Sequence, residues 1–384
     1  MKVCFISHSS AKGGAERALL ELLEALKGNG VECCVLLPSD GPLVNELKKL
    51  GVDFCTLPYK WWMGVKTPFW KRLGRTVINL AVTIPVAMKI KRWKCDVVYT
   101  NTITVCVGAF AAPLVRLPHV WHIHEFGYED HRLVFDLREK LSLWLMNRLS
   151  YVFIANSNAV AQKYAQHIPP HKLKMVYQSV SVKQRFLNSQ VSFSEQPDKE
   201  AGIRCVIVGA LQEGKRQEEA ILAIGELVHA GIDAELFIVG HGNLKYQDYL
   251  QKLVSENELD RYVKFIGYVE NPFPFVKSAD VVLMCSRNEA FGRVTVEAIK
   301  IGKPVIGARS GGTIELIRDG FNGFLYTPGD YKELAAKIKY LYEHPDVVRD
   351  MGKNGLQWTK EYFTQERYGE EVLTILQQLM EYKS

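Results

Sequence analysis

Two glutamates, eight residues apart, are the residues of this sequence best placed to do chemistry. Glu289 lies in the polar stretch after the apolar run Val281–Cys285, and Glu297 lies in the segment that follows, which predicts a helix. Gly292 stands between them, so backbone N–H groups at the start of that helix lie near both carboxylates. Two carboxylates beside free N–H groups suit a ligand that carries hydroxyls and a phosphate. The alternative, from these residues alone, is a capping acid followed by a solvated helical glutamate.

The first half of the chain carries two weaker candidates. Gly13 and Gly14 separate the first apolar run from a helical segment, where free amides favour an anion or a closely approaching ligand. The alternative is an ordinary tight turn, and the G-x-G-x-x-G spacing of a dinucleotide site is lacking. His124 follows the apolar run Val120–Ile123, at the end of the strand where parallel sheets bind ligands. His122 lies on the same side of that strand, but no third ligand is apparent, so we predict no metal site.

Apolar runs that alternate with helical periodicity must position these residues. They predict an α/β fold of two tandem doubly wound Rossmann-like domains facing a cleft. We expect a first domain over residues 1–180, completed by a C-terminal helix at about 365–384. A polar stretch over 181–203 predicts a linker, and a second domain is expected over 204–364.

Composition excludes several classes of protein. The 384 residues carry a net charge of +6, a surplus too small and too diluted to indicate a nucleic-acid binder. The eight cysteines include no C-x-x-C pair, so neither a disulfide framework nor a zinc site is indicated. We therefore expect a reducing compartment and a cytoplasmic location.

The charge is concentrated in residues 60–94. No acidic residue occurs between Asp53 and Asp96, whereas that interval holds nine cations and four of the seven tryptophans. Interfacial helices combine cations with Trp, so we expect this stretch to bind an anionic membrane surface on the cytoplasmic face. The alternative is a helix that packs its Trp residues on its own domain. The longest apolar run, Val77–Met88, has about twelve residues, fewer than the roughly 20 that span a bilayer.

The run from Glu289 to Glu297 resembles the E-x7-E motif of the retaining glycosyltransferases of family four, which have the GT-B fold. The likeness extends over nearly the whole chain through ordered landmarks. These include Gly13-Gly-Ala-Glu-Arg17, His124-Glu125, Ala155-Asn-Ser157, Val208-Gly209, Val239-Gly-His-Gly242, Gly302-Lys-Pro-Val-Ile306, Gly311-Gly-Thr-Ile-Glu315 and Asp319-Gly-Phe-Asn-Gly323.

The resemblance implies a role for each matched residue. Glu289 is expected to bind hydroxyls of the donor sugar, Glu297 the ribose of the nucleotide, and His124 the sugar near its anomeric carbon. Lys215 is expected to neutralise the diphosphate. It also implies that the amides around Ala290, Phe291 and Gly292 lie beside the donor sugar and that those around Arg293 and Val294 lie beside the diphosphate. Gly14 and Gly209 are two further donor-binding positions that the resemblance implies.

One position departs from the family pattern. Many members carry Arg directly after the glycine that corresponds to Gly209, where this chain has Ala210. We expect Arg216 or Arg293 to supply the missing cation. The alternative is that Arg216 is a solvated residue at the start of a helix.

The resemblance implies a retaining, metal-independent glycosyltransferase that uses a nucleotide-diphosphate sugar and needs no further cofactor. No protein nucleophile is expected, because the leaving phosphate is thought to help deprotonate the acceptor. The acceptor expected is a lipid-linked or cell-envelope glycan. Two alternatives stay open: a non-catalytic nucleotide-sugar-binding partner of another transferase, suggested by Ala210, and a sugar-nucleotide epimerase of similar architecture.

Overall fold

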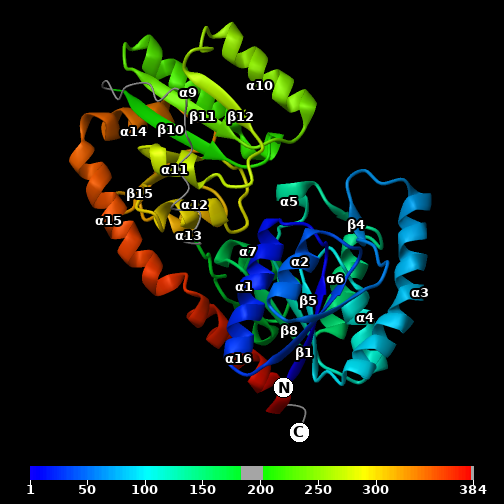
Figure 1. Ribbon diagram of the computed structural model, residues 1–384. Coiled ribbons are helices and arrows are strands. Elements are labelled where there is room, and N and C mark those ends of the chain that lie inside the picture. Colours follow the sequence, from blue (N-terminus) through cyan, green and yellow to red (C-terminus); the bar gives the residue numbers. More distant parts are fainter. Residues whose placement is uncertain (183–201, 382–384) are drawn as a thin grey trace. The chain divides into compact units, whose positions relative to one another are not determined.

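The computed structural model describes residues 1–182 and 202–381, and the chain forms two compact units. Unit 1 comprises Met1–Val180 together with Phe363–Ser384, and unit 2 comprises Ser181–Tyr362 (Figure 1). The predicted linker falls largely on residues 183–201, which lie outside the described residues. Each unit contains its own parallel sheet, so the predicted α/β class is confirmed.

Unit 1 is built on a seven-stranded sheet in which every pair of neighbouring strands is parallel. The strand order is β3 (Asp53–Thr56), β2 (Glu32–Leu37), β1 (Lys2–Ser7), β5 (Val97–Asn101), β6 (His119–Ile123), β8 (Val152–Ala155) and β9 (Leu173–Met175). The short strands β4 (Met63–Gly64) and β7 (Val134–Phe135) pair antiparallel beside it.

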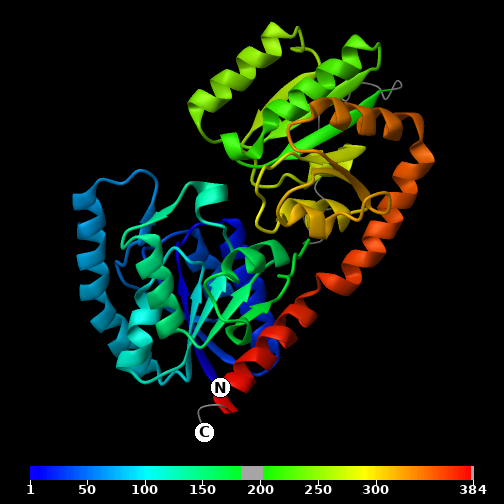
Figure 2. The same cartoon turned by 180° about the vertical axis from the view of Figure 1, so that it is seen from behind.

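Alternation along β1 divides the core of unit 1 between the two faces of the sheet. Val3 and Phe5 belong to one buried cluster and Cys4 and Ile6 to another, because successive side chains of a strand point to opposite faces. Helices α1 (Gly14–Gly28), α2 (Pro42–Lys49) and α16 (Gln365–Glu381) cover the first face. Helices α3 (Phe69–Trp93) and α4 (Val107–Leu114) cover the second, and Figure 2 shows both from behind.

The remaining helices of unit 1 are α5 (Tyr128–His131), α6 (Glu139–Leu149) and α7 (Asn158–Tyr164). The C-terminal helix α16 packs on α1 through a buried stripe that includes Tyr368, Val372 and Leu376. Gly369 permits this close packing, since a Cβ there would lie 2.5 Å from the Cβ of Ala25. The end of the chain therefore completes the core of unit 1.

Unit 2 is built on a six-stranded sheet whose neighbouring strands are also all parallel. The strand order is β12 (Val263–Gly267), β11 (Ala234–Val239), β10 (Ile203–Val208), β13 (Val281–Met284), β14 (Val305–Ala308) and β15 (Gly323–Tyr326). Its helices are α9 (Gln217–His229), α10 (Leu244–Glu256), α11 (Phe273–Ser278), α12 (Arg293–Ile299), α13 (Thr313–Leu316), α14 (Tyr331–Glu343) and α15 (Pro345–Tyr362).

The backbones that follow β10 and β11 touch each other. Gly209 donates its N–H to the carbonyl of Val239 at 3.0 Å. A Cβ at Gly240 would lie 1.9 Å from the carbonyl oxygen of Gly209, and the φ of Gly240 is +143°. This contact requires glycine at position 240, because any side chain would meet backbone and not a flexible neighbour.

We expect Gly240→Ala to lower the free energy of unfolding of unit 2 by at least about 2 kcal/mol, through the unfavourable φ and the steric clash. The matched control is Gly225→Ala in α9, where a Cβ would meet only the side chain of Leu259 at 3.4 Å. A helical Gly→Ala change leaves stability equal or raises it. Chemical denaturation of both variants checks this, and equal midpoints would contradict it.

Candidate functional site

The loop between β13 and α12 holds both glutamates of the motif. Glu289 lies in the loop, and Glu297 is buried in the middle of α12, which begins directly after Gly292. Gly292 has a φ of +94° and forms the N-terminal boundary of the helix. The amides of Arg293 and Val294 therefore belong to the first turn of α12, as the sequence predicts.

A second loop holds the backbone of Glu289 in place. Gly312 donates its N–H to the carbonyl of Glu289 at 2.7 Å. A Cβ at Gly311 would lie 2.4 Å from the same carbonyl oxygen, and one at Gly312 would lie 2.7 Å from the carbonyl oxygen of Ala290. The Gly-Gly pair thus lets two loops pack backbone against backbone, and it positions the segment Glu289–Phe291.

Lys215 and Glu289 form an ion pair, with Lys215 Nζ 2.6 Å from Glu289 Oε2. Lys215 ends a single 3-10 turn, Glu213–Lys215, and the N–H of Arg287 donates to the carbonyl of Gly214 at 3.0 Å. Both side chains are partly exposed, at 31% for Lys215 and 16% for Glu289. The structure therefore brings together two residues that lie 74 positions apart.

Arg216 is engaged by acids of its own helix. Its Nε lies 2.8 Å from Glu219 Oε1 and 3.3 Å from Glu218 Oε1. The hydrogen bond to Glu219 raises the pKa of Arg216 above its usual value. Buried Glu219 also accepts hydrogen bonds from Tyr326 Oη at 2.8 Å and from the N–H of Gly329 at 3.1 Å. To take the place of the Arg missing at Ala210, Arg216 would have to leave Glu218 and Glu219.

In unit 1, a buried acid, Glu16, lies in the first turn of α1, beside the turn that holds Gly13. The carboxylate of Glu16 accepts a hydrogen bond from Ser9 Oγ and lies 3.3 Å from His8 Nε2. Burial lowers the pKa of His8, so at neutral pH the imidazole in this contact is neutral. Because Glu16 brings negative charge to the N-terminus of α1, the turn favours an uncharged, closely approaching ligand over a phosphate.

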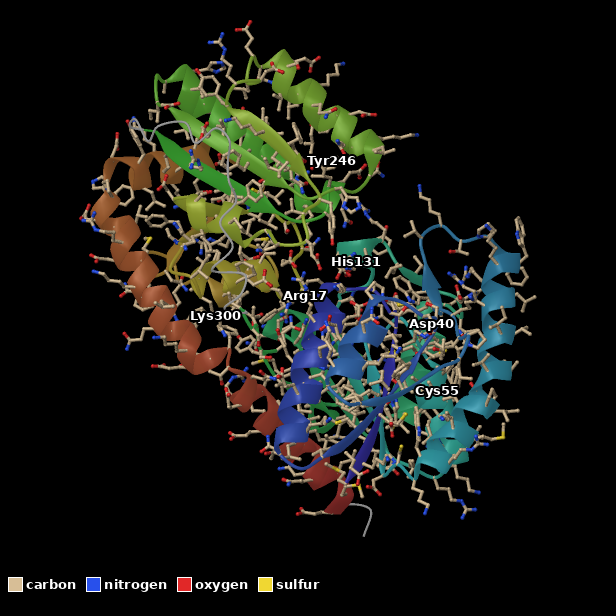
Figure 3. All side chains as sticks on the ribbon, viewed as in Figure 1. Arg17, Asp40, Cys55, His131, Tyr246 and Lys300 are labelled. Atoms are coloured by element: carbon tan, nitrogen blue, oxygen red, sulfur yellow. The ribbon has the colours of Figure 1, made fainter. Side chains whose placement is uncertain are left out.

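His124 and the start of α1 are joined by one side chain. Asn101 at the end of β5 is hydrogen-bonded through Oδ1 to His124 Nε2 at 2.8 Å, and its Nδ2 donates to the carbonyl of Ala15 at 3.2 Å. The structure therefore brings His124 and Gly14 to one edge of the sheet. Figure 3 labels two further residues at this edge, Arg17 on α1 and His131 on α5. Asn101 is not among the residues predicted from the sequence, although its position at the end of a strand was a usable signal.

His122 and His124 lie on the same side of β6, with ring centroids 4.0 Å apart. Tyr99 Oη shares a hydrogen bond of 2.8 Å with His122 Nδ1. Burial lowers the pKa of His122 to about 3, so this imidazole is neutral. His122 therefore supports the ring of His124 within the core of unit 1.

Glu125 is a buried acid whose role the sequence did not indicate. Its Oε2 accepts the N–H groups of Ile103 and His124 at 3.3 Å and 3.2 Å. Burial, together with the charge of Asp130, raises the pKa of Glu125 to about 8 in spite of these hydrogen bonds. Glu125 thus connects the loop after β5 to the loop after β6, and it fixes the backbone of His124.

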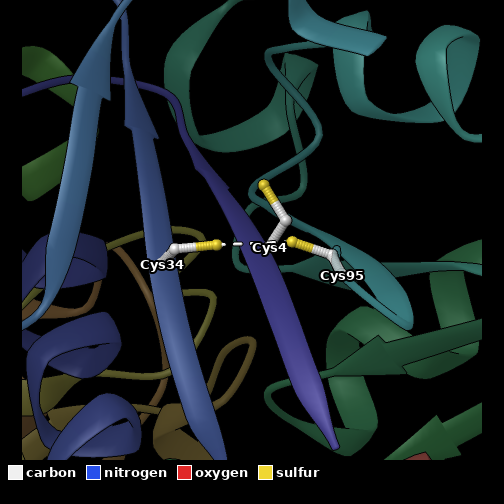
Figure 4. A group of neighbouring side chains, drawn as sticks. All are labelled: Cys4, Cys34 and Cys95. Carbon is white, nitrogen blue, oxygen red and sulfur yellow. Dashed lines mark hydrogen bonds between the residues drawn. The ribbon is translucent and has the colours of Figure 1, made fainter. Parts of the chain in front are cut away.

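Three buried cysteines form a cluster that could hold a metal ion. Among the described residues, no other group of His, Cys, Asp and Glu side chains has such an arrangement. Cys4, Cys34 and Cys95 have their Sγ atoms within 4.8 Å of one another, and Cys34 Sγ lies 3.5 Å from Cys95 Sγ (Figure 4). Thiolates favour soft metals, but burial raises the pKa of Cys4 well above its usual value, so a proton would have to leave. No local spacing indicates this cluster, because it arises from the strand register that places Cys4 opposite Cys34.

Comparisons with known proteins indicate the family and the fold of this chain. A model described as Glycosyltransferase Family 4 matches residues 12–184, and one described as Glycosyl transferases group 1 matches residues 189–358. The chain is similar to the N-acetyl-alpha-D-glucosaminyl L-malate synthase of Bacillus anthracis, with 28% identity over 235 residues, 59% of this chain and 59% of that protein. The match thus spans less than two thirds of the length of that relative.

Two further proteins are similar to this chain. The capsular polysaccharide biosynthesis glycosyltransferase CapM of Staphylococcus aureus is 27% identical over 169 residues, 43% of each chain. The crystal structure of Anabaena Alr3699/HepE in complex with UDP matches with a TM-score of 0.81 and 24% identity, covering 98% of this chain and 100% of that one. The same protein has been solved in complex with UDP-glucose.

The raised pKa of Glu125 makes stability depend on pH. Between pH 4.5 and about 8 this carboxyl is protonated in the folded state and ionised in the unfolded state. Because the folded state binds more protons, its stability falls as pH rises through this range, by at most about 1.4 kcal/mol per pH unit. We expect Glu125→Gln to remove this loss, so the variant gains stability relative to the unmodified chain between pH 5 and pH 8.

Urea denaturation followed by Trp fluorescence measures this, since six of the seven tryptophans lie in unit 1. The control is Glu129→Gln, whose side chain is 44% exposed and contacts Lys163. If the free energy of unfolding changed with pH in the same way in Glu125→Gln and in the unmodified chain, Glu125 would be ionised in the folded state.

Proposed function

This chain belongs to the group 1, family four glycosyltransferases, and we propose that it transfers a sugar from a uridine-diphosphate sugar to a glycan acceptor. The family retains the configuration of the anomeric carbon, and we propose the same outcome here. The choice of uridine diphosphate is supported by Anabaena Alr3699/HepE, which was solved with UDP and with UDP-glucose.

The observation that carries this proposal is the contact between Lys215 and Glu289 beside the start of α12. The contact brings the ammonium of Lys215 next to the carboxylate of Glu289, and Glu297 follows eight residues later within α12. A diphosphate needs positive charge and N–H donors, whereas a ribose and a hexose need acceptors for their hydroxyls. Unit 2 supplies both kinds of group within one set of loops.

We propose that each residue of unit 2 has the role that the family pattern assigns to it. Glu297 binds the ribose, and Glu289 binds the transferred sugar. The amides of Ala290, Phe291 and Gly292 line the sugar, and those of Arg293 and Val294, together with Lys215, neutralise the diphosphate as it leaves. Gly209 leaves room for the nucleotide because it has no side chain.

For unit 1 we propose that His124 contacts the donor sugar near its anomeric carbon and that Gly14 lets a ligand approach its turn. Asn101 and Glu125 are positioning residues that hold the ring and backbone of His124. No protein nucleophile takes part: the leaving phosphate helps to deprotonate the acceptor, which attacks from the same face. Transfer proceeds without a divalent metal.

For the acceptor we propose a lipid-linked or cell-envelope glycan, an assignment supported by the similarity to CapM, a capsular polysaccharide enzyme. A non-catalytic nucleotide-sugar-binding partner is the second candidate, because Ala210 removes a cation that many members use and Arg216 is engaged elsewhere. The two candidates differ in whether the purified chain turns over its donor.

A screen of UDP-sugars by thermal shift identifies the donor, since a ligand that binds the native state raises the melting temperature. Proton NMR of donor hydrolysis, with water as the acceptor, then tests catalysis. We expect the α-anomer of the sugar to appear first from an α-linked donor. First appearance of the β-anomer would exclude retention, and binding without turnover would favour the non-catalytic candidate.

Substitution of the two glutamates should have different effects on UDP affinity and turnover in the same assays. We expect Glu297→Ala to weaken UDP binding, whereas Glu289→Ala should leave UDP affinity equal or higher, because it frees the Lys215 ammonium, while lowering turnover. The matched control is Glu226→Ala, an exposed acid of α9. Equal UDP affinity in the unmodified chain and Glu297→Ala would reject the ribose assignment.

Lys215 should matter only for ligands that carry the diphosphate. We expect Lys215→Met to lower UDP affinity by roughly 10- to 100-fold, the value of a hydrogen bond to a charged group, and to leave uridine affinity unchanged. Lys252→Met, at an exposed ion pair of α10, is the control. Calorimetric titration with both ligands checks this, and equal losses for UDP and uridine would indicate a folding defect instead.

A further inference from the structure

Helix α3 exposes an apolar stripe along its length. Most of its exposed large hydrophobic residues recur at spacings of three and four, which places them on one face of a helix. They are Phe69, Trp70, Leu73, Val77, Leu80, Ile84 and Met88, and Ile78 is also exposed, at 40%. Phe69 and Trp70 are 73% and 71% exposed. An apolar surface of this length on a soluble unit indicates an interaction site.

The opposite face of α3 is fixed to unit 1. Val86, Ala87 and Ile90 belong to the buried cluster that covers one face of the sheet. Asn79 is buried and accepts the N–H of Lys60 at 2.8 Å. Arg72 and Arg75 both contact Asp136, and Arg72 also donates to the carbonyl of Phe135 at 3.0 Å.

These contacts decide how the helix can meet a bilayer. Among the described residues, α3 is the helix long and apolar enough to cross a membrane by length and composition. The sequence predicted an apolar run of about twelve residues, too short to span a bilayer. The helix is longer than that run because the flanking cations and Pro85 lie within one continuous helix of 25 residues. A spanning helix cannot keep one face packed on a sheet, so α3 can only lie along the membrane surface.

The charged residues of α3 are all of one sign. Arg72 and Arg75 are bound to Asp136, but the other seven cations of residues 60–94 form no ion pair with any described residue. They are Lys60, Lys66, Lys71, Lys89, Lys91, Arg92 and Lys94. Two copies of this face would bring like charges together, which opposes self-association, whereas an anionic lipid surface complements them.

We propose that the exposed face of α3 binds the interface of a bilayer that contains anionic phospholipids, with the helix axis in the membrane plane. The stripe enters the boundary between headgroups and acyl chains, and the cations lie among the headgroups. Trp62 takes no part, because it is buried and stacks on Trp121 with ring centroids 5.7 Å apart. Binding through this face would place the chain where a lipid-linked acceptor would be.

The test is sedimentation of the full chain with vesicles of phosphatidylcholine alone and with one quarter phosphatidylglycerol. We expect binding to the anionic vesicles only, weakened in 0.5 M salt because salt screens the cations. In an apolar variant, Trp70→Ser with Leu80→Ser and Ile84→Ser, the partition coefficient should fall at least tenfold. A charge variant, Lys71→Gln with Lys91→Gln and Arg92→Gln, should lose the preference for anionic lipid.

The control is Leu244→Ser with Tyr249→Ser on α10, which removes exposed apolar side chains elsewhere and should leave binding unchanged. Unchanged affinity for a UDP-sugar shows that each variant is folded. If no donor binds, the circular dichroism spectrum serves the same purpose. Unchanged vesicle binding in the apolar variant would overturn the proposal. A dimer of the unmodified chain in sedimentation velocity that is lost in the apolar variant would also overturn the proposal, because the stripe would then bind a second copy.

Discussion

The parallel pairing of strands is the constraint on which the candidate residues depend. When all strands of a sheet point the same way, every loop that leaves a carboxyl end lies at one edge. In unit 1 this edge brings together Gly14 at the start of α1, Asn101 at the end of β5 and His124 directly after β6. In unit 2 it brings Lys215 and Glu289 together from the loops after β10 and β13. The sheets therefore assemble groups from distant parts of the sequence without any local motif.

The loops themselves are held mainly by backbone contacts. Glu289 is supported at its carbonyl by the amide of Gly312, and Glu125 accepts the amides of Ile103 and His124. Contacts of this kind depend on chain geometry and on small residues more than on side-chain packing. They explain why a Gly-Gly pair more than twenty residues after Glu289 belongs to the same pattern as the glutamate itself.

Most of the fold could be predicted from the sequence, because buried parallel strands are short apolar runs and the helices between them show clear periodicity. The apolar runs Val120–Ile123 and Val281–Cys285 illustrate this, since the strands His119–Ile123 and Val281–Met284 follow them closely. The two glutamates and Lys215 were recognisable from a family pattern. Their mutual contact was not, because it depends on how loops fold over the ends of neighbouring strands.

Long-range register and packing account for the rest. The thiol cluster follows from the pairing of Cys4 with Cys34, which no sequence spacing encodes. Residues 60–94 form a single basic segment in the sequence, but the structure divides them by their contacts. Arg72, Arg75 and Trp62 hold unit 1 together, whereas the exposed face of α3 has no structural task within the unit.

The ion pair of Lys215 and Glu289 also bears on how a donor would be selected. A diphosphate that takes the ammonium of Lys215 leaves a partly buried carboxylate, only 16% exposed, without its counter-charge. Such a group is unfavourable unless other donors replace the cation, and the hydroxyls of a transferred sugar are donors of that kind. If the donor binds as proposed, a complete nucleotide sugar satisfies both members of the pair, whereas the nucleotide diphosphate alone satisfies one. The re-formed ion pair would then compete with the product for Lys215, and the same contact would favour donor over product at the end of each turnover.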